Sequence, residues 1–187
     1  MGAEYTPLKQ GSTQMVKYHD RSVSVERTIA ASAERVFAAL ADPTVHAVID
    51  GSGTLRPMTA GAADPLSSGA TFITPMGRRV RGCTRADMVQ AAVAVLVQGQ
   101  MRNTVVEFDY GRRIAWRNFG RHIWRFELTP VTGCRSATHV RETFDYSTNL
   151  APWLLEWARF PSRNACAMTD TLQALDRLLA TESEIVD

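Results

Sequence analysis

The chain has 187 residues, of which 45% are hydrophobic and 21% charged, a balance typical of one folded domain rather than of a disordered or membrane-spanning chain. The formal net charge of +2 is small and the basic residues are spread along the chain, which excludes a nucleic acid as the main partner. The three cysteines lack metal-ligand spacing, so we expect buried or half-buried thiols in a reducing compartment.

The first 21 residues contain no apolar stretch of the kind that a secretory signal requires, and we expect residues 1–21 to form a flexible tail. The longest strongly apolar run, residues 91–97, is far shorter than the roughly 20 residues that cross a bilayer. We therefore expect a cytoplasmic protein with no membrane span. A single domain is expected over residues 22–181, followed by a short C-terminal tail at 182–187.

Residues 22–29 alternate between apolar and polar side chains with a period of two, which predicts a β-strand. Ser32 then fits the N-cap of a helix, because its hydroxyl can accept a hydrogen bond from a backbone amide of the first turn. The dipeptide Asp42-Pro43 ends this helix and begins a second, short one, which is expected to end at Gly51.

The middle of the chain departs from a simple run of strands. An extended segment is expected over residues 69–76, but residues 77–100 form an atypical insertion that is longer and more apolar than a hairpin connection. Val93, Val95 and Val97 fit either an additional strand or a short helix, and their spacing does not decide between the two. We interpret the insertion as an edge element without chemistry, with a lid over a pocket or a homodimer contact as the functional alternatives.

Three amphipathic segments follow over residues 105–146, each closed by a short turn, and Gly111, Gly120 and Gly133 mark the reversals of the chain. Alternation of apolar and polar residues interrupted by glycine turns predicts an antiparallel meander. One face of such a sheet must be buried against another element.

The C-terminal segment, residues 152–180, fits a long helix that covers this face. Its apolar residues recur every three or four positions, and Pro152 suits the first helical turn. Pro161 predicts a kink or a break, with Ser162 placed to cap the second part. Since a curved sheet wrapped around one helix tends to leave a hollow, an internal ligand pocket is the leading expectation.

The order of these elements resembles the helix-grip fold of the START-like, birch-pollen-allergen-like superfamily. The sequence is similar to its polyketide cyclase/dehydrase-type branch between residue 22 and about residue 179, in the segments VSVERTIAASAERVFAALADP, NTVVEFDYGRRIAWR, HIWRFELTPV, RETFDYS and TLQALDRLL. The resemblance implies an α+β fold in which a curved antiparallel sheet of about seven strands wraps around a long C-terminal helix, with two short helices after the first strand. It leaves the activity open, because members resemble one another as ligand carriers, cyclases, hydratases and regulators.

Side-chain parity in the meander indicates which residues face the expected pocket. Alternate residues of the predicted strands 122–130 and 138–146 share one face, and the aromatic set is expected to point inward. The predicted ligand contacts are Trp116, Asn118, Trp124, Phe126, Phe144, Tyr146 and Trp157.

Glu142 and His122 are the candidate catalytic residues. Burial should raise the pKa of Glu142 unless Arg117, Arg141 or a ligand cation pairs with it, and such a carboxyl could donate or accept a proton. The alternative interpretations are a buried carboxylate paired with an arginine, and a histidine at the rim of the pocket.

Other polar residues give weaker signals. His46 and Asp50 share a face of the second predicted helix, and they fit either a solvated pair or groups near the pocket mouth. The chain has no HExxH motif, no His/Cys cluster and no carboxylate array, so no metal is expected. It has no P-loop, GxSxG motif or dinucleotide fingerprint, and no cofactor is expected either.

Three functions are compatible with the sequence. The first is binding of a hydrophobic small molecule, polyketide-like, lipid-like or aromatic, in an internal cavity. The second, implied by the resemblance, is a cofactor-free polyketide cyclase or dehydratase in which an internal acid and base move protons. The third is a protein-interaction module.

Overall fold

The computed structural model describes residues 14–58, 64–77, 84–96, 98–133 and 136–184. Within these residues, seven antiparallel strands form one sheet in the order β1-β2-β7-β6-β5-β4-β3, and five helices accompany it. In chain order the elements are β1 (Met15–His19), β2 (Ser22–Ile29), α1 (Ala33–Ala41), α2 (Pro43–Ile49), β3 (Thr71–Pro75), α3 (Arg85–Leu96), β4 (Gln100–Asp109), β5 (Arg113–Asn118), β6 (Ile123–Pro130), β7 (Thr138–Asp145), α4 (Pro152–Trp157) and α5 (Phe160–Glu184).

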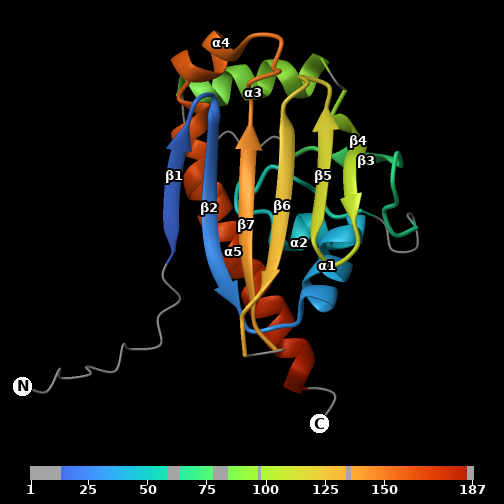
Figure 1. Ribbon diagram of the computed structural model, residues 1–187. Coiled ribbons are helices and arrows are strands. Elements are labelled where there is room, and N and C mark those ends of the chain that lie inside the picture. The colour runs from blue at the N-terminus through green and yellow to red at the C-terminus, as the bar shows by residue number, and fades with distance from the viewer. Residues whose placement is uncertain (1–13, 59–63, 78–83, 97, 134–135, 185–187) are drawn as a thin grey trace, which may run out of the picture.

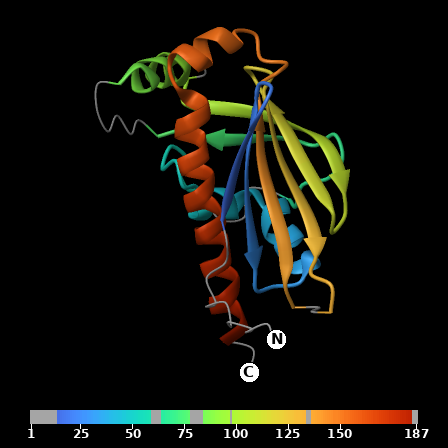
Figure 2. The same cartoon turned by 60° about the vertical axis from the view of Figure 1, so that its left-hand side comes forward.

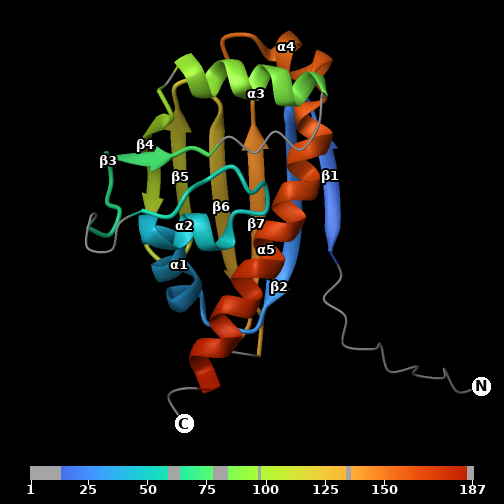
Figure 3. The same cartoon turned by 180° about the vertical axis from the view of Figure 1, so that it is seen from behind.

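The sheet is curved and α5 packs on one of its faces, as Figures 1 and 2 show. Seen from behind, α5 crosses the sheet obliquely, α3 runs across its upper end, and α1 and α2 lie below (Figure 3). A change of register between Val105 and Glu107 in β4 adds to the bend. The predicted helix-grip architecture, with two short helices after the strand 22–29, is confirmed.

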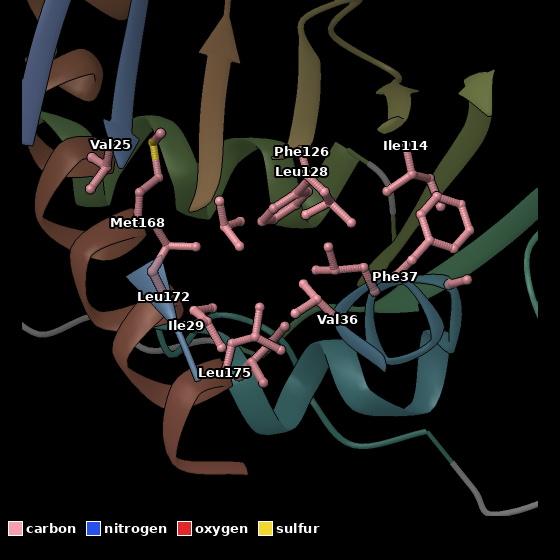
Figure 4. Packing of buried hydrophobic residues seen from close by; sticks show 14 of the residues in the cluster. Val25, Ile29, Val36, Phe37, Ile114, Phe126, Leu128, Met168, Leu172 and Leu175 are labelled. Atoms are coloured by element: carbon pink, nitrogen blue, oxygen red, sulfur yellow. The ribbon is translucent and has the colours of Figure 1, made fainter. Parts of the chain in front are cut away.

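The core lies between α5 and the inner face of the sheet. The buried residues of α5 recur every three or four positions, as predicted, and they are Ala165, Met168, Leu172, Leu175 and Leu179. Figure 4 shows Met168 and Leu172 close to Val25, with Leu175 close to Ile29. An ion pair fixes the helix further, because Arg27 of β2 reaches Asp176 of α5 at 2.7 Å.

The two short helices begin as the sequence predicts. The Ser32 hydroxyl accepts a hydrogen bond from the Arg35 amide at 3.4 Å, and the Asp42 carboxylate accepts one from the Thr44 amide at 2.8 Å. Pro43 occupies the first turn of α2, where its missing amide hydrogen leaves no intrahelical bond unmade. These caps hold α2 close to the inner face of the sheet.

Two predicted boundaries are wrong. Residues 15–19, which were expected to belong to the flexible tail, form β1 and pair with β2 from Met15 opposite Glu26 to His19 opposite Ser22. At the other end, α5 continues through Glu184 into the predicted C-terminal tail. Residues 1–13 and 185–187 lie outside the described residues, so the rest of the two tail predictions is untested.

The insertion 77–100 contains a helix, α3, and not the strand that its valines also allowed. Thr84 and Asp87 form a reciprocal cap at its start: the Thr84 hydroxyl donates to the Asp87 carboxylate at 2.6 Å and accepts from the Asp87 amide at 3.2 Å. Gln100 already belongs to β4. Residues 78–83 and Val97 lie outside the described residues.

The predicted break near Pro161 occurs two residues earlier. Arg159 separates α4 from α5 with a φ of 60°, and Pro161 then lies in the first turn of α5, where proline is tolerated. Ser162 does not cap the second helix. Its hydroxyl lies inside the first turn and donates to the carbonyl of Arg159 at 3.2 Å.

Candidate functional site

A pocket of about 590 Å³, named here the central pocket, lies on the inner face of the sheet. Its walls come from β3 to β7, from α2 and the loop of residues 50–55, from α3, and from the first half of α5. The elements that Figure 3 shows around this face, with α3 above, α5 to one side and α2 below, are therefore the ones that line it.

Aromatic rings form most of the sheet side of the central pocket. The ring of Trp116 stacks on His46 with a centroid distance of 4.9 Å and lies 5.6 Å from Phe126. Trp124 packs against Phe144 at 4.8 Å. The five predicted ligand contacts that line the pocket are Trp116, Asn118, Trp124, Phe126 and Phe144.

Glu142 lies in the middle of this aromatic wall. It stands on the central strand β7, directly opposite Val25 of β2 and Phe126 of β6, and only 4% of the residue is exposed. Its Oε2 atom is buried without a hydrogen-bond partner among the described residues. Burial, and then the nearby charge of Asp50, raises the pKa of this carboxyl well above its ordinary value.

Among the described residues, no arginine forms the predicted ion pair with Glu142. The neighbouring Arg141 points to the other face of the sheet, because successive strand residues alternate, and it binds Glu26 there at 2.7 Å. Glu142 is therefore a residue of the pocket lining whose carboxyl is buried and whose Oε2 atom has no hydrogen-bond partner in the described part of the chain.

Asp50 is held beside the central pocket by its own loop. Its carboxylate accepts hydrogen bonds from the amides of Thr54 and Leu55, both at 2.7 Å, and from the hydroxyl of Ser52 at 2.6 Å. Gly51 lets this loop lie against α5, since a Cβ there would come within 2.1 Å of the carbonyl oxygen of Ala167. The position of the Asp50 charge is thus fixed by backbone contacts.

His122 lies just before β6, half-buried, with its ring on the pocket lining. The side-chain amides of Asn118 and Asn149 face its two ring nitrogens, with 3.1 Å from Asn149 Nδ2 to Nδ1. Asn149 is oriented by the Gly120 carbonyl at 2.7 Å and the Ala151 amide at 2.9 Å, so its nitrogen must be the atom that faces the ring. Burial lowers the pKa of His122 to about 4, which leaves a neutral imidazole.

His46 also lines the pocket, but the predicted solvated pair with Asp50 is wrong. His46 is 6% exposed, and its Nε2 donates to the carbonyl of Leu40 at 2.8 Å. Burial lowers its pKa, so the ring is a neutral aromatic surface stacked on Trp116. The α2 helix brings it to the pocket because His46 shares the inner face of that helix with Ile49.

Two predicted ligand contacts are outside the pocket lining. Tyr146 is buried beyond the end of β7, where its ring stacks on Phe144 at 5.5 Å. Trp157 of α4 is 48% exposed and packs under the guanidinium of Arg85 at 4.8 Å. Parity placed Tyr146 on the correct face, but the face continues past the end of the pocket.

The sequence prediction missed the helical side of the pocket. Val89, Gln90 and Val93 of α3 line it, and Arg163 of α5 donates to Asp87 of α3 at 2.9 Å. The spacing of Val89 and Val93, four residues apart, and the Thr-x-x-Asp cap before them were the available signals. The interpretation of this segment as an edge element without chemistry, and its alternatives of a lid or a homodimer contact, stay hypotheses.

The described residues contain no group of three or more His, Cys, Asp or Glu side chains placed to hold a metal ion. Within the same part of the chain, no helix is both long and apolar enough to cross a bilayer. Cys166 is exposed, which contradicts the expectation of buried thiols, while Cys83 and Cys134 lie outside the described residues.

Comparisons with known proteins agree with this architecture. Residues 20–180 match the model of the family described as polyketide cyclase / dehydrase and lipid transport. No match to a curated protein was found. Among solved structures, the chain is similar to a protein from Rhodobacter sphaeroides, with 20% identity, a TM-score of 0.61, and coverage of 90% of this chain and 99% of that one.

Two further solved structures are similar over most of their length. A protein from Mycobacterium smegmatis shares 17% identity at a TM-score of 0.58, with 92% of this chain and 99% of that chain covered. An AHSA1-like protein from Aeromonas hydrophila shares 17% identity at a TM-score of 0.56, with 87% and 94% covered. At these identities the likeness concerns the fold alone.

Proposed function

The chain belongs to the polyketide cyclase / dehydrase and lipid transport family, and we propose that it binds a hydrophobic small molecule, polyketide-like, lipid-like or aromatic, in the central pocket. One observation carries the proposal: an aromatic-lined pocket contains a buried carboxyl, Glu142, with an oxygen that has no partner among the described residues. Unsatisfied buried polar atoms are rare, and a ligand group would supply the missing partner.

The size and chemistry of the pocket support this proposal. A volume of about 590 Å³ falls within the roughly 300–1,000 Å³ of small-molecule sites. Apolar burial at about 25 cal/mol per Å² would supply the affinity, so a ligand that buries about 300 Å² gains on the order of 7 kcal/mol before entropic losses. Asn118, His122 and Glu142 would then orient the ligand.

The positions of two of these groups suggest the shape of the ligand. Glu142 stands opposite Phe126, which is four residues along the chain from His122. Four residues of extended chain span about 13 Å. The backbones of the two residues are therefore about this far apart, which favours an elongated or polycyclic ligand.

Native mass spectrometry of the freshly purified protein tests the proposal. We expect a co-purifying adduct in the wild type and its loss in Val93→Trp, which fills the pocket from α3. Val95→Trp is the matched control, because Val95 lies on the same helix with 74% of its surface exposed. An adduct that persists equally in both variants, with unchanged circular dichroism, would contradict binding in the central pocket.

A second candidate function is cofactor-free cyclisation or dehydration of a polyketone. The observation that favours it is a pair of titratable groups in one pocket whose pKa values are shifted in opposite directions: that of Glu142 is raised, and that of His122 is lowered to about 4. A neutral imidazole could take a proton from the carbon between two carbonyls, and a neutral carboxyl could protonate the oxygen of the carbonyl that is attacked. We rank it second because the two residues are separated by about 13 Å of backbone along the sheet.

Incubation with a linear poly-β-ketone, followed by mass spectrometry, tests this second function. Aldol closure with dehydration would give a product lighter than the substrate by one water molecule. Glu142→Gln and His122→Gln should each slow its formation at least tenfold, whereas Glu127→Gln on the outer face of the sheet should not. Equal rates in all four proteins would exclude an acid/base role for the pair.

A further inference from the structure

The charges that line the central pocket are unbalanced. Its lining contains four carboxylic acids and, among the described residues, a single arginine, and these residues are Asp50, Asp87, Glu142, Asp170 and Arg163. The arginine is already engaged, because Arg163 is 2.9 Å from the Asp87 carboxylate. The two histidines of the lining add no positive charge near neutral pH, since burial lowers the pKa of each.

We propose that the ligand of the central pocket carries a protonated amine that lies against the carboxyl of Glu142 on the side of Asp50. The inference rests on the proposed function, since it names the class of the molecule that the pocket binds. It makes the ligand an amine with a large apolar or aromatic body.

Glu142 has the surroundings that such an amine needs. Its Oε2 atom is more than nine-tenths buried with its residue and lacks a hydrogen-bond partner in the described part of the chain. An ammonium group against this carboxyl would favour its ionised form. Asp50 adds a second negative charge nearby, and its carboxylate is held in place by the loop amides.

The aromatic wall favours a cation of this kind for a separate reason. Phe126 lies directly opposite Glu142, and Phe144 follows it on the same face of β7. The faces of aromatic rings attract cations, most strongly where water is excluded. An organic ammonium can therefore make both the charged contact and the apolar contacts of the pocket.

The same lining disfavours an anionic ligand. A carboxylate or phosphate in this pocket would face Asp50, Glu142 and Asp170, and the only arginine among the described lining residues is held by Asp87. Like charges in a partly buried site repel more strongly than in water. A neutral ligand, such as one that presents a carbonyl to a protonated Glu142, is the remaining alternative, and probes of different charge distinguish it from an amine.

Three probes of one shape but different charge test the inference: 2-(2-naphthyl)ethylamine, 2-(2-naphthyl)ethanol and 2-naphthylacetate. Isothermal titration calorimetry at pH 7.5 should give an affinity for the amine at least tenfold above that for the alcohol, with the carboxylate weaker than both. In Glu142→Gln the ratio of amine to alcohol affinity should fall about tenfold. Glu127→Gln removes one carboxylate from the outer face of the sheet and should leave that ratio unchanged.

The outcomes separate this inference from the proposed function. If the alcohol binds the wild type as tightly as the amine does, the amine proposal is overturned while hydrophobic binding stands. The amine proposal is likewise overturned if Glu142→Gln and Glu127→Gln keep equal ratios. If none of the three probes binds and no adduct co-purifies with the protein, both proposals fail.

Discussion

Glu26 and Glu142 are two buried carboxylic acids on neighbouring strands that differ in almost every other respect. They lie on opposite faces of the sheet, since Val25 pairs with Glu142 and Glu26 pairs with Arg141. Both are at most 5% exposed. Glu26 on the outer face has partners at 2.9 Å from Lys17 and 2.7 Å from Arg141, whereas the Oε2 atom of Glu142 on the inner face has no hydrogen-bond partner in the described chain.

The contrast shows that burial alone does not distinguish a structural carboxylate from a functional one. Burial raises the pKa of both groups, but hydrogen bonds from Lys17 and Arg141 outweigh it at Glu26, and the pKa of Glu26 is lowered. At Glu142 burial and the charge of Asp50 act together, and the pKa is raised. Glu26 is covered by its own partners at the surface of the sheet, while Glu142 is enclosed by the core and the pocket.

The largest expected effect on stability is at the outer face. Glu26→Gln should lower the free energy of unfolding by about 2 kcal/mol, because charge-assisted hydrogen bonds to Lys17 and Arg141 are lost. Urea denaturation at pH 7 measures the change. Glu127→Gln, whose side chain is 40% exposed, is the control and should change the free energy by less than about 0.5 kcal/mol. Equal effects of the two substitutions would mean that the partners of Glu26 contribute nothing specific.

At the inner face, removal of the carboxyl should stabilise the protein instead of destabilising it. Glu142→Met replaces an unpaired buried carboxyl with an apolar side chain of similar length, and it should raise the free energy of unfolding by about 1 kcal/mol at pH 8. The same denaturation experiment measures it. A loss of about 1 kcal/mol or more would show that Glu142 has a stabilising partner in the folded protein, and the functional interpretation of its open oxygen would then be wrong.

The dependence of these two effects on pH should be opposite as well. The folded-state pKa of Glu142 is raised, so the folded protein binds more protons than the unfolded chain above pH 4.5, and stability falls as pH rises toward that pKa. The advantage of Glu142→Met should therefore grow above pH 4.5 and vanish below it.

For Glu26 the folded-state pKa is lowered, so its contribution is complete above pH 4.5 and is lost as pH falls through the folded pKa. The penalty of Glu26→Gln should then shrink in acid. Denaturation curves of both variants and the wild type between pH 3 and pH 8 give both trends. Parallel curves for all three proteins would contradict the difference between the two faces.

The smallest effect is expected at Asp87, a third buried carboxylate. It lines the pocket and is bound by Thr84 and Arg163. Asp87→Asn removes the charge that holds Arg163 and weakens the cap at Thr84, so amides of α3 should exchange hydrogen faster. Hydrogen exchange followed by mass spectrometry reports this, with Glu156→Gln on α4 as the exposed control. Unchanged exchange in α3 would show that this ion pair does not hold the helix on α5.

Much of the fold could be predicted because its signals are local. Alternation over residues 22–29 gave the bounds of β2, and parity put Trp124, Phe126 and Glu142 on the inner face because successive strand side chains must point in opposite directions. β1 was missed because its five residues are all exposed and show no alternation between buried and exposed positions. A strand that gains its stability from pairing with a neighbour leaves little trace in its own sequence.

The candidate site was predicted only from its sheet side. Parity cannot tell where a pocket ends along a face, so Tyr146 was included although the lining stops before it. The spacing of α4 did not show that Trp157 would turn outward, because that depends on how α4 sits relative to α3 and α5. Val89, Gln90 and Val93 were missed because the spacing of the two valines marks one face of α3, but apolar residues elsewhere on the helix leave undecided which face is covered.

Apart from β1 and α3, the order of strands and helices follows from the amino-acid sequence by itself, as do the inner set of aromatic residues and the inward side of Glu142, since periodicity is a property of neighbouring residues. Only the tertiary structure decided that Arg141 forms an ion pair with Glu26 and that the charge of Asp50 lies near Glu142. It also decided that an oxygen of Glu142 is left without a hydrogen-bond partner among the described residues. Those features depend on which distant segments meet across the sheet. The electrostatics of a buried group is set by such neighbours in space and not by neighbours in sequence.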